Sequence, residues 1–166
     1  MFRKVLVGTP LVFLALTSYM AFAIGEARHS VNIVAAVPSS VFYVVPVDRS
    51  LIDKDQRLHF DPISEQLSTL RAQFDTKNTN GSIEAMLESE AFLSNGVASD
   101  KIPLVVTFNR VALNHTAAVE VLSDAESTPG KRVDFVVTPT KPTGGYKPGD
   151  YTGVVAMRFD AVLPTP

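Results

Sequence analysis

The sequence predicts an all-β sandwich, and three observations support this fold class. Short runs rich in β-branched and aromatic residues recur about every 10 to 15 residues along the chain. Clusters of Pro, Gly, Ser and Asp separate these runs, and no long helical pattern occurs between them. The chain has 166 residues, the length of about one domain, with eleven prolines and nine glycines. Many short strands joined by turns are typical of a sandwich.

The first 23 residues are predicted to be a secretory signal peptide. A short basic start precedes an apolar run from Val5 to Ala23, which ends in the small-x-small pattern Ala21-Phe22-Ala23 that a signal peptidase accepts. Pro10 interrupts the run, whereas a transmembrane anchor needs about 20 predominantly apolar residues. A retained anchor is the alternative. We expect export, with cleavage after Ala23.

The first predicted strand lies in the segment 24–38, directly after the signal peptide. Val31, Ile33, Ala35 and Val37 recur at a period of two and so share one face of a strand, which Pro38 ends. After this break, residues 41–47 form a second β-branched and aromatic run, and residues 48–57 read as a charged loop without hydrophobic period. The predicted domain organisation is a signal peptide (1–23), an N-terminal extension (24–38) and a sandwich domain (39–166).

The middle of the chain contains one ambiguous segment. Short strands are predicted at 58–63 and 67–74, and Asn80-Gly81 predicts a tight hairpin turn because both residues tolerate positive φ. Residues 82–95 combine helix-forming residues with alternating apolar ones. Because a hairpin turn stands directly before them, we expect a strand over 82–88 and a short helical turn around 90–94.

The second half of the chain carries four predicted strands, at 102–108, 117–122, 132–138 and 150–162. The last of these has the clearest alternation. One face of this C-terminal strand is predicted to join the core through Tyr151, Gly153, Val155, Met157 and Phe159. Pro, Gly and Asp crowd the segment 142–150 before it, which predicts a turn.

The composition excludes several functional classes. The absence of cysteine rules out a disulfide scaffold, a thiolate zinc site and a cysteine nucleophile. Fifteen basic against seventeen acidic residues, without a Lys/Arg block, argue against a nucleic acid as partner. His29, His59 and His115 lack metal-ligand spacing, and the acidic residues of 84–100 fit a solvated edge better than a glycosidase pair. We therefore predict no enzyme and no catalytic, metal-binding or cofactor-binding residue.

The strand at 30–37 allows two interpretations. It is either an ordinary first strand that pairs within its own chain, or a donor strand that completes the sheet of a neighbouring copy by strand addition. Periodicity and composition alone leave both interpretations open.

Four blocks of the sequence point to a known family: Ser30–Pro38, the Thr79-Asn80 turn into 83–87, Ile102–Val106 and Pro148–Val155. Each block alone is weakly specific. Their order and spacing over nearly the whole exported chain resemble those of the alpha-type chaperone–usher fimbrial major subunits, the family of colonisation-factor-antigen and coli-surface-antigen pilins.

This resemblance implies an incomplete immunoglobulin-like β-sandwich that lacks one strand and receives it from the next copy. The chain would be a structural subunit of a surface fimbria, a pilus shaft that polymerises by donor-strand exchange and supports adhesion and colonisation. Its partners would be neighbouring copies, a periplasmic chaperone, an outer-membrane usher and a tip adhesin. It would pass through the periplasm to the cell surface.

Within that picture the donor residues are Val31, Ile33, Ala35 and Val37. The small side chain of Ala35 either sets the register of the inserted strand or is incidental. Tyr151 and Phe159 are expected in the core of the final strand, with pairing to a chaperone as the alternative use of that strand.

Two rival functions stay open beside this one. The first is a self-contained secreted β-sandwich that binds a carbohydrate or a protein ligand. The chain has no Trp, and Tyr43, Tyr146 and Tyr151 fall mostly in predicted strands or turns, which argues against an aromatic binding loop. The second is a secreted hydrolase, for which the sequence offers neither a nucleophile motif nor a metal-ligand pattern.

Overall fold

The structure is a computed structural model, and it describes residues 41–164. The described residues belong to one compact unit. The predicted signal peptide and the predicted donor residues Val31, Ile33, Ala35 and Val37 lie outside the described residues.

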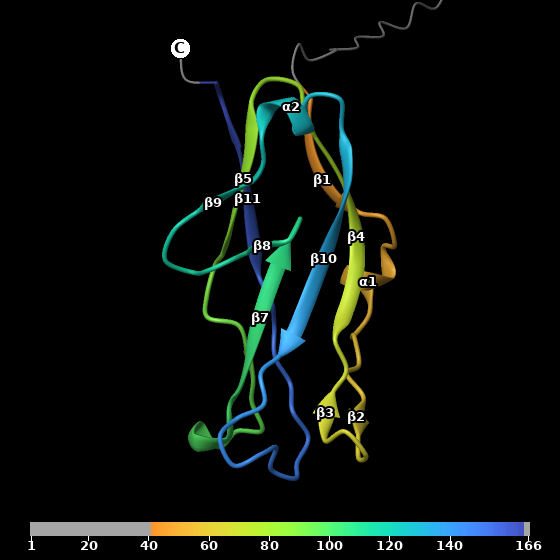
Figure 1. Ribbon diagram of the computed structural model, residues 1–166, viewed down its shortest axis with the longest axis vertical. Helices are drawn as coiled ribbons and strands as arrows, with labels where there is room; N and C mark the ends of the chain where they lie inside the picture. The colour runs from red at the N-terminus through yellow and green to blue at the C-terminus, as the bar shows by residue number, and fades with distance from the viewer. Residues whose placement is uncertain (1–40, 165–166) are drawn as a thin grey trace, which may run out of the picture. The chain divides into compact units, whose positions relative to one another are not determined.

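Two antiparallel sheets form the domain (Figure 1). The larger sheet has the strand order β1-β4-β10-β7-β6, with β8 attached to β7. Its strands are β1 (Phe42–Pro46), β4 (Leu70–Asn78), β6 (Phe92–Leu93), β7 (Ile102–Phe108), β8 (Val111–Ala112) and β10 (Lys131–Pro139). The smaller sheet has the order β11-β5-β9, with β5 (Ser82–Leu87), β9 (Val119–Leu122) and β11 (Met157–Val162). The predicted all-β sandwich is confirmed.

Short elements connect these strands. A separate hairpin consists of β2 (Phe60–Asp61) and β3 (Gln66–Leu67), and the three helices of the described residues are single turns: α1 (Ser50–Asp53), η1 (Ala98–Asp100) and α2 (Asp124–Ser127). A capping box between Ser123 and Glu126 starts α2, since the Glu126 carboxylate accepts the Ser123 backbone N–H at 3.3 Å. No helix among residues 41–164 has the length and apolar character of a membrane span.

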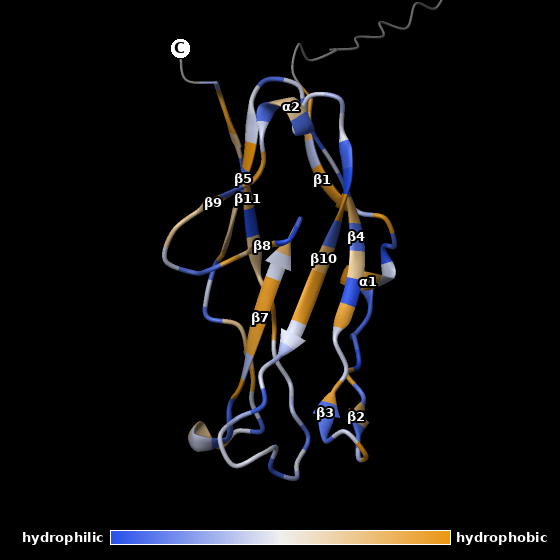
Figure 2. Cartoon of the chain, viewed as in Figure 1, coloured by the Kyte–Doolittle hydropathy of each residue, from blue (hydrophilic) through white to orange (hydrophobic). Residues whose placement is uncertain are grey.

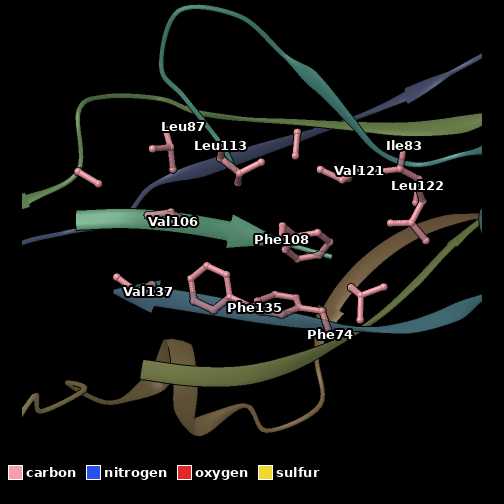
Figure 3. Packing of buried hydrophobic residues seen from close by; sticks show 13 residues of the cluster. Phe74, Ile83, Leu87, Val106, Phe108, Leu113, Val121, Leu122, Phe135 and Val137 are labelled. Atoms are coloured by element: carbon pink, nitrogen blue, oxygen red, sulfur yellow. The ribbon is translucent and has the colours of Figure 1, made fainter. Parts of the chain in front are cut away.

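The core lies between the sheets, where alternate residues of each strand point inward. Its centre is an aromatic cluster: the ring of Phe74 on β4 lies 5.4 Å from that of Phe108 on β7 and 5.6 Å from that of Phe135 on β10. The smaller sheet lies across the core from them and contributes the fully buried Ile83 of β5 (Figure 3). Ala85 of the same strand is also fully buried. Buried residues recur at every second position in much of β4, β5 and β10, as the alternation in their sequences predicts.

The predicted helical turn at 90–94 is wrong. Phe92 and Leu93 form β6 instead, opposite Pro103 and Ile102 of β7. The Lys101 ammonium lies 4.0 Å from the centre of the Phe92 ring, which adds a cation–π contact. Pairing with β7 thus overrides the local helix propensity, and the helical turn of this region is η1.

The final strand is shorter than predicted. The sequence pattern predicts it from residue 150, but β11 begins at Met157. Before it the chain makes one isolated bridge, between Thr152 and Ser94. A side chain on Gly153 would overlap the carbonyl oxygen of Phe92, so glycine permits the close backbone approach there. Residues 150–156 therefore follow the β6 region before entering the smaller sheet.

A turn lies at Asn80-Gly81, but the predicted hairpin is wrong, because β4 and β5 do not pair with each other and belong to different sheets. Gly81 is held tightly in this turn. Its φ is +116°, a conformation that other residues rarely adopt. A Cβ atom on Gly81 would overlap the carbonyl oxygen of Val162, at the end of β11. The Ser127 hydroxyl donates to the Gly81 carbonyl, and the Gly81 N–H donates to the Asp124 carboxylate at 3.2 Å. This turn therefore fixes the end of β11 against α2.

We expect Gly81→Ala to destabilise the domain more than Gly96→Ala does. Both glycines have positive φ, which costs an alanine about 1–3 kcal/mol, but only Gly81 also faces the Val162 backbone. Gly96 has no atom within 4 Å of the added Cβ and serves as the matched control. Thermal unfolding of the two variants measures the difference. Equal melting temperatures would contradict the close packing of Gly81 against β11.

Candidate functional site

The last strand, β11, has an open edge within residues 41–164, where it pairs with β5 alone. The Glu88 N–H donates to the Ala156 carbonyl at 3.0 Å. Backbone groups alternate between the two sides of an antiparallel strand. Met157, Phe159 and Ala161 therefore direct their N–H and C=O groups away from β5, to the open side. These three residues offer a ready hydrogen-bonding edge to a further strand.

The first described strand, β1, has a second open edge, since β4 is its one partner among the described strands. The Val47 N–H donates to the Gln73 carbonyl at 2.9 Å. The backbone N–H and C=O groups of the odd-numbered residues of β1 therefore point toward β4. Phe42, Val44 and Pro46 consequently turn their backbone groups the other way. Pro46 has no N–H to leave unsatisfied there, as expected of proline on an edge strand.

Strand order places both open edges on the same side of the sandwich. At one end of the smaller sheet, β9 contacts β8, which is paired with β7 of the larger sheet. The opposite end of the smaller sheet is β11, and the end of the larger sheet remote from β6 is β1. The side that carries the edges of β11 and β1 therefore lies opposite the side that β8 and β9 close.

Apolar side chains are incompletely covered on this side. Ile83 and Ala85 on the neighbouring strand β5 are 0% exposed, whereas the inward residues of β1, the start of β4, and β11 are only half-buried against the core. We call this surface the open flank, and define it by Val44, Leu51, Leu70, Ala72, Met157 and Phe159. Phe159 joins the flank to the core, because its ring lies 4.8 Å from the ring of Phe108.

A shallow hollow of about 220 Å³ lies at the α1 end of the open flank. Leu51 of α1 and Leu70 and Ala72 of β4 contribute its apolar wall, and Gln56 and Arg71 add polar groups. β1 ends at Pro46, opposite Phe74, so the first residues of β4, from Leu70, extend beyond the end of β1. The hollow lies there, because α1 covers this part of β4 incompletely. An apolar side chain of an incoming strand would fit such a wall.

The predicted residues of the C-terminal strand occupy different positions along this region. Met157 and Phe159 lie in β11 and on the open flank, and Val155, just before β11, also packs against the core. Tyr151 lies earlier, where its hydroxyl donates to the Lys147 carbonyl at 3.1 Å. Gly153 lies where the backbone approaches Phe92 closely.

Sequence reasoning missed Leu51, Leu70 and Ala72 as members of the site. The alternation of Leu70, Ala72 and Phe74 indicates a strand face, but not that this face lies beside an open edge. Leu51 stands in a charged segment without hydrophobic period, so nothing local marks it.

The described residues form no metal-binding cluster. No group of three or more His, Asp or Glu side chains within residues 41–164 converges on a metal position. The pKa shifts that the structure produces belong to surface groups: the hydrogen bond from Arg132 lowers the pKa of Asp75, and the one from Lys141 lowers the pKa of Glu65. Asp48, Asp61 and Glu126 also have lowered pKa values through hydrogen bonds. Such pairs stabilise loops and strands.

The lowered pKa values predict loss of stability in acid. These carboxyls bind protons less readily in the folded chain than in the unfolded one, whose values lie near about 4. Their stabilisation is complete above that range and is lost as the pH falls through the lower folded pKa values. We expect the melting temperature to decrease once the pH is lower than about 4. Asp75→Asn should make this fall shallower in pH-dependent melting curves, and a melting temperature independent of acid pH would contradict the expectation.

Comparisons with known proteins identify relatives of this fold and sequence. The model of a family described as the CS1 type fimbrial major subunit matches residues 27–160. The fold is similar to that of the CooA pilin subunit from enterotoxigenic Escherichia coli, with a TM-score of 0.56 and 16% sequence identity. That alignment covers 70% of this chain and 86% of the pilin chain. The comparison with curated proteins gives no match.

Proposed function

The chain belongs to the CS1 type fimbrial major subunit family, and on that premise we propose that it is a shaft subunit that polymerises by donor-strand exchange. The donor is the segment Ser30–Val37 of one copy. The acceptor is the open flank of the next copy, between the edges of β11 and β1. Each copy then completes the sandwich of its neighbour, and a fibre of many copies results.

The observation that carries this proposal is the combination of two open edges on one side of the sandwich with a half-buried apolar flank. A strand placed there would pair with the free backbone groups of Met157, Phe159 and Ala161, which recur at every second residue. Val31, Ile33, Ala35 and Val37 recur at the same period of two, so all four would point toward the flank together. Full burial of a valine or isoleucine contributes about 1.5–3 kcal/mol before the cost of ordering the strand.

The same flank explains the need for assembly partners. An open apolar edge invites aggregation before the donor strand arrives. A periplasmic chaperone would cover the flank during transit, and an outer-membrane usher would exchange the chaperone for the next subunit. The finished fibre would stand on the cell surface, with a tip adhesin at its end, and would support adhesion and colonisation.

Two chains test the proposal against a self-contained sandwich. Deletion of residues 24–37 should abolish polymerisation and leave a subunit bound to the chaperone. Fusion of Ser30–Val37 after Pro166 through a short linker should give a stable monomer that does not polymerise, as measured by size-exclusion chromatography. If the exported chain instead folds alone as a stable monomer, and the deletion merely unfolds it, donor-strand exchange is the wrong mechanism.

A further inference from the structure

The sandwich has two ends that differ in structure (Figure 1). The turn end contains the Asn80-Gly81 turn, α2, the start of β1 and the last residues of β11. The far end contains the β2–β3 hairpin, η1 and the loop 142–149. At the far end, Phe60 of β2 lies 6.0 Å from Tyr146 in ring-centre distance, and the Lys141 ammonium lies 2.8 Å from the Glu65 carboxylate. The hairpin and the loop are thus fastened together.

Large apolar side chains are exposed at both ends. At the far end, Ile63 in the β2–β3 hairpin is 95% exposed and Phe60 is 51% exposed, and the hairpin tip stands out as hydrophobic in Figure 2. At the turn end, Leu163 is 68% exposed. An isoleucine almost fully in water at the tip of a hairpin contributes nothing to the fold of its own domain.

The direction of the incoming donor strand links the two ends. Every strand pairing among the described residues is antiparallel. Val162 at the end of β11 lies opposite Ser82, next to the turn, so β11 runs from the far end toward the turn end. A donor strand antiparallel to β11 therefore enters the flank at the turn end and leaves it, at Val37, at the far end.

The connection from the donor strand to its own domain is short. Only Pro38, Ser39 and Ser40 separate Val37 from Val41. The Val41 N–H donates to the Thr79 hydroxyl at 2.8 Å, which fastens Val41 to the turn end of its own domain. Four residue steps reach at most about 14 Å, at about 3.5 Å per residue. The turn end of the donating copy must therefore lie close to the far end of the receiving copy.

From these observations we infer a second interface between successive copies, in which the β2–β3 hairpin around Ile63 of one copy contacts the turn end around Leu163 of the next. The inference rests on the proposed donor-strand exchange. The contact is head-to-tail and joins unlike surfaces, so it repeats along the fibre without closing. It would add a second restraint on the orientation of successive copies, beside the inserted strand.

The absence of cysteine from the chain allows a direct test by cross-linking. Ile63→Cys and Leu163→Cys are introduced together into the full chain, fibres are assembled with its export machinery, and a bifunctional maleimide of short span is added. Because each copy carries both thiols, a head-to-tail contact gives a ladder that extends well beyond dimers in denaturing gels. The matched control pairs Leu163→Cys with Ile52→Cys, since Ile52 is also well exposed, at 70%, but lies on α1 away from both ends.

The outcomes separate this inference from the proposed function. A long ladder with the Ile63 pair, at least several times more intense than with the Ile52 pair, supports the interface. Normal fibres with equal ladders from both pairs, or with no ladder beyond dimers, overturn the interface and leave donor-strand exchange intact. If the fused, self-complemented monomer gives the same long ladder, the contact does not depend on the fibre, and the inference is wrong. If deletion of residues 24–37 leaves polymerisation unchanged, the proposed function fails, and this inference fails with it.

Discussion

Ile33→Asp is expected to leave the subunit able to fold and to bind its chaperone, but unable to join a fibre. In the proposed complex, Ile33 lies at the middle of the donor strand and points into the open flank of another copy. The substitution removes the burial of an isoleucine, worth about 1.5–3 kcal/mol, and places a carboxylate against apolar side chains. Leaving a buried charge without a partner costs about 3–5 kcal/mol. Together these terms weaken each joint by more than a hundred-fold.

Asn32→Asp provides the matched control for this prediction. It introduces the same carboxylate one residue away, but successive side chains of a strand point to opposite faces, so the new carboxylate stays in water. Synthetic peptides of residues 24–38 with either substitution can be titrated against the chaperone-bound subunit that lacks residues 24–37. We expect the Asn32→Asp peptide to be captured nearly as well as the unsubstituted peptide, and capture to be lost only for the Ile33→Asp peptide. Equal loss for both peptides would contradict the assigned face of the donor strand.

Much of the fold could be predicted because its strands have local signatures. The alternation in residues 82–88 and 102–108 predicts β5 and β7 nearly to the residue. Asn80-Gly81 predicts the turn after β4, although this turn leads from one sheet to the other instead of closing a hairpin. The α2 turn also has a local signal that sequence reasoning missed, the spacing Ser123-x-x-Glu126 of a capping box. In these places intrinsic preference and tertiary structure agree.

The remaining differences arise where distant segments decide the structure. Phe92 and Leu93 join β7 rather than a helical turn because a sheet edge is available at Ile102 and Pro103. The start of β11 depends on the contact between Thr152 and Ser94, which are far apart in the sequence. No local pattern encodes such pairings.

The candidate site illustrates the same limit. The alternating residues of the donor strand are visible in the sequence because a strand face is a local property. The open flank is not visible in the sequence, because strand order decides which strand lies at an edge. β11 is an edge strand because its sheet has the order β11-β5-β9. Leu70 and Ala72 belong to the flank because α1 covers that part of β4 incompletely.

Phe108→Ala is expected to remove about 3–5 kcal/mol from the unfolding free energy of the self-complemented monomer. Phe108 is completely buried, and its ring contacts Phe74 of the larger sheet and Phe159 of β11. The loss is a large part of the about 5–15 kcal/mol that stabilises a typical domain. Urea unfolding measures it, with Phe60→Ala as the control, since Phe60 is half-exposed and should lose about 1 kcal/mol or less.

The same substitution tests whether the core and the open flank are coupled. Phe159 lies on the flank and rests on Phe108, so a cavity at position 108 leaves the Phe159 ring without its support. Phe108→Ala should therefore also weaken capture of the donor peptide by a subunit without residues 24–37, although residue 108 is not on the flank. Phe60→Ala, at the far end, should leave capture unchanged. If Phe108→Ala reduces stability but not peptide capture, the donor strand does not contact Phe159, and the acceptor surface must lie elsewhere on the sandwich.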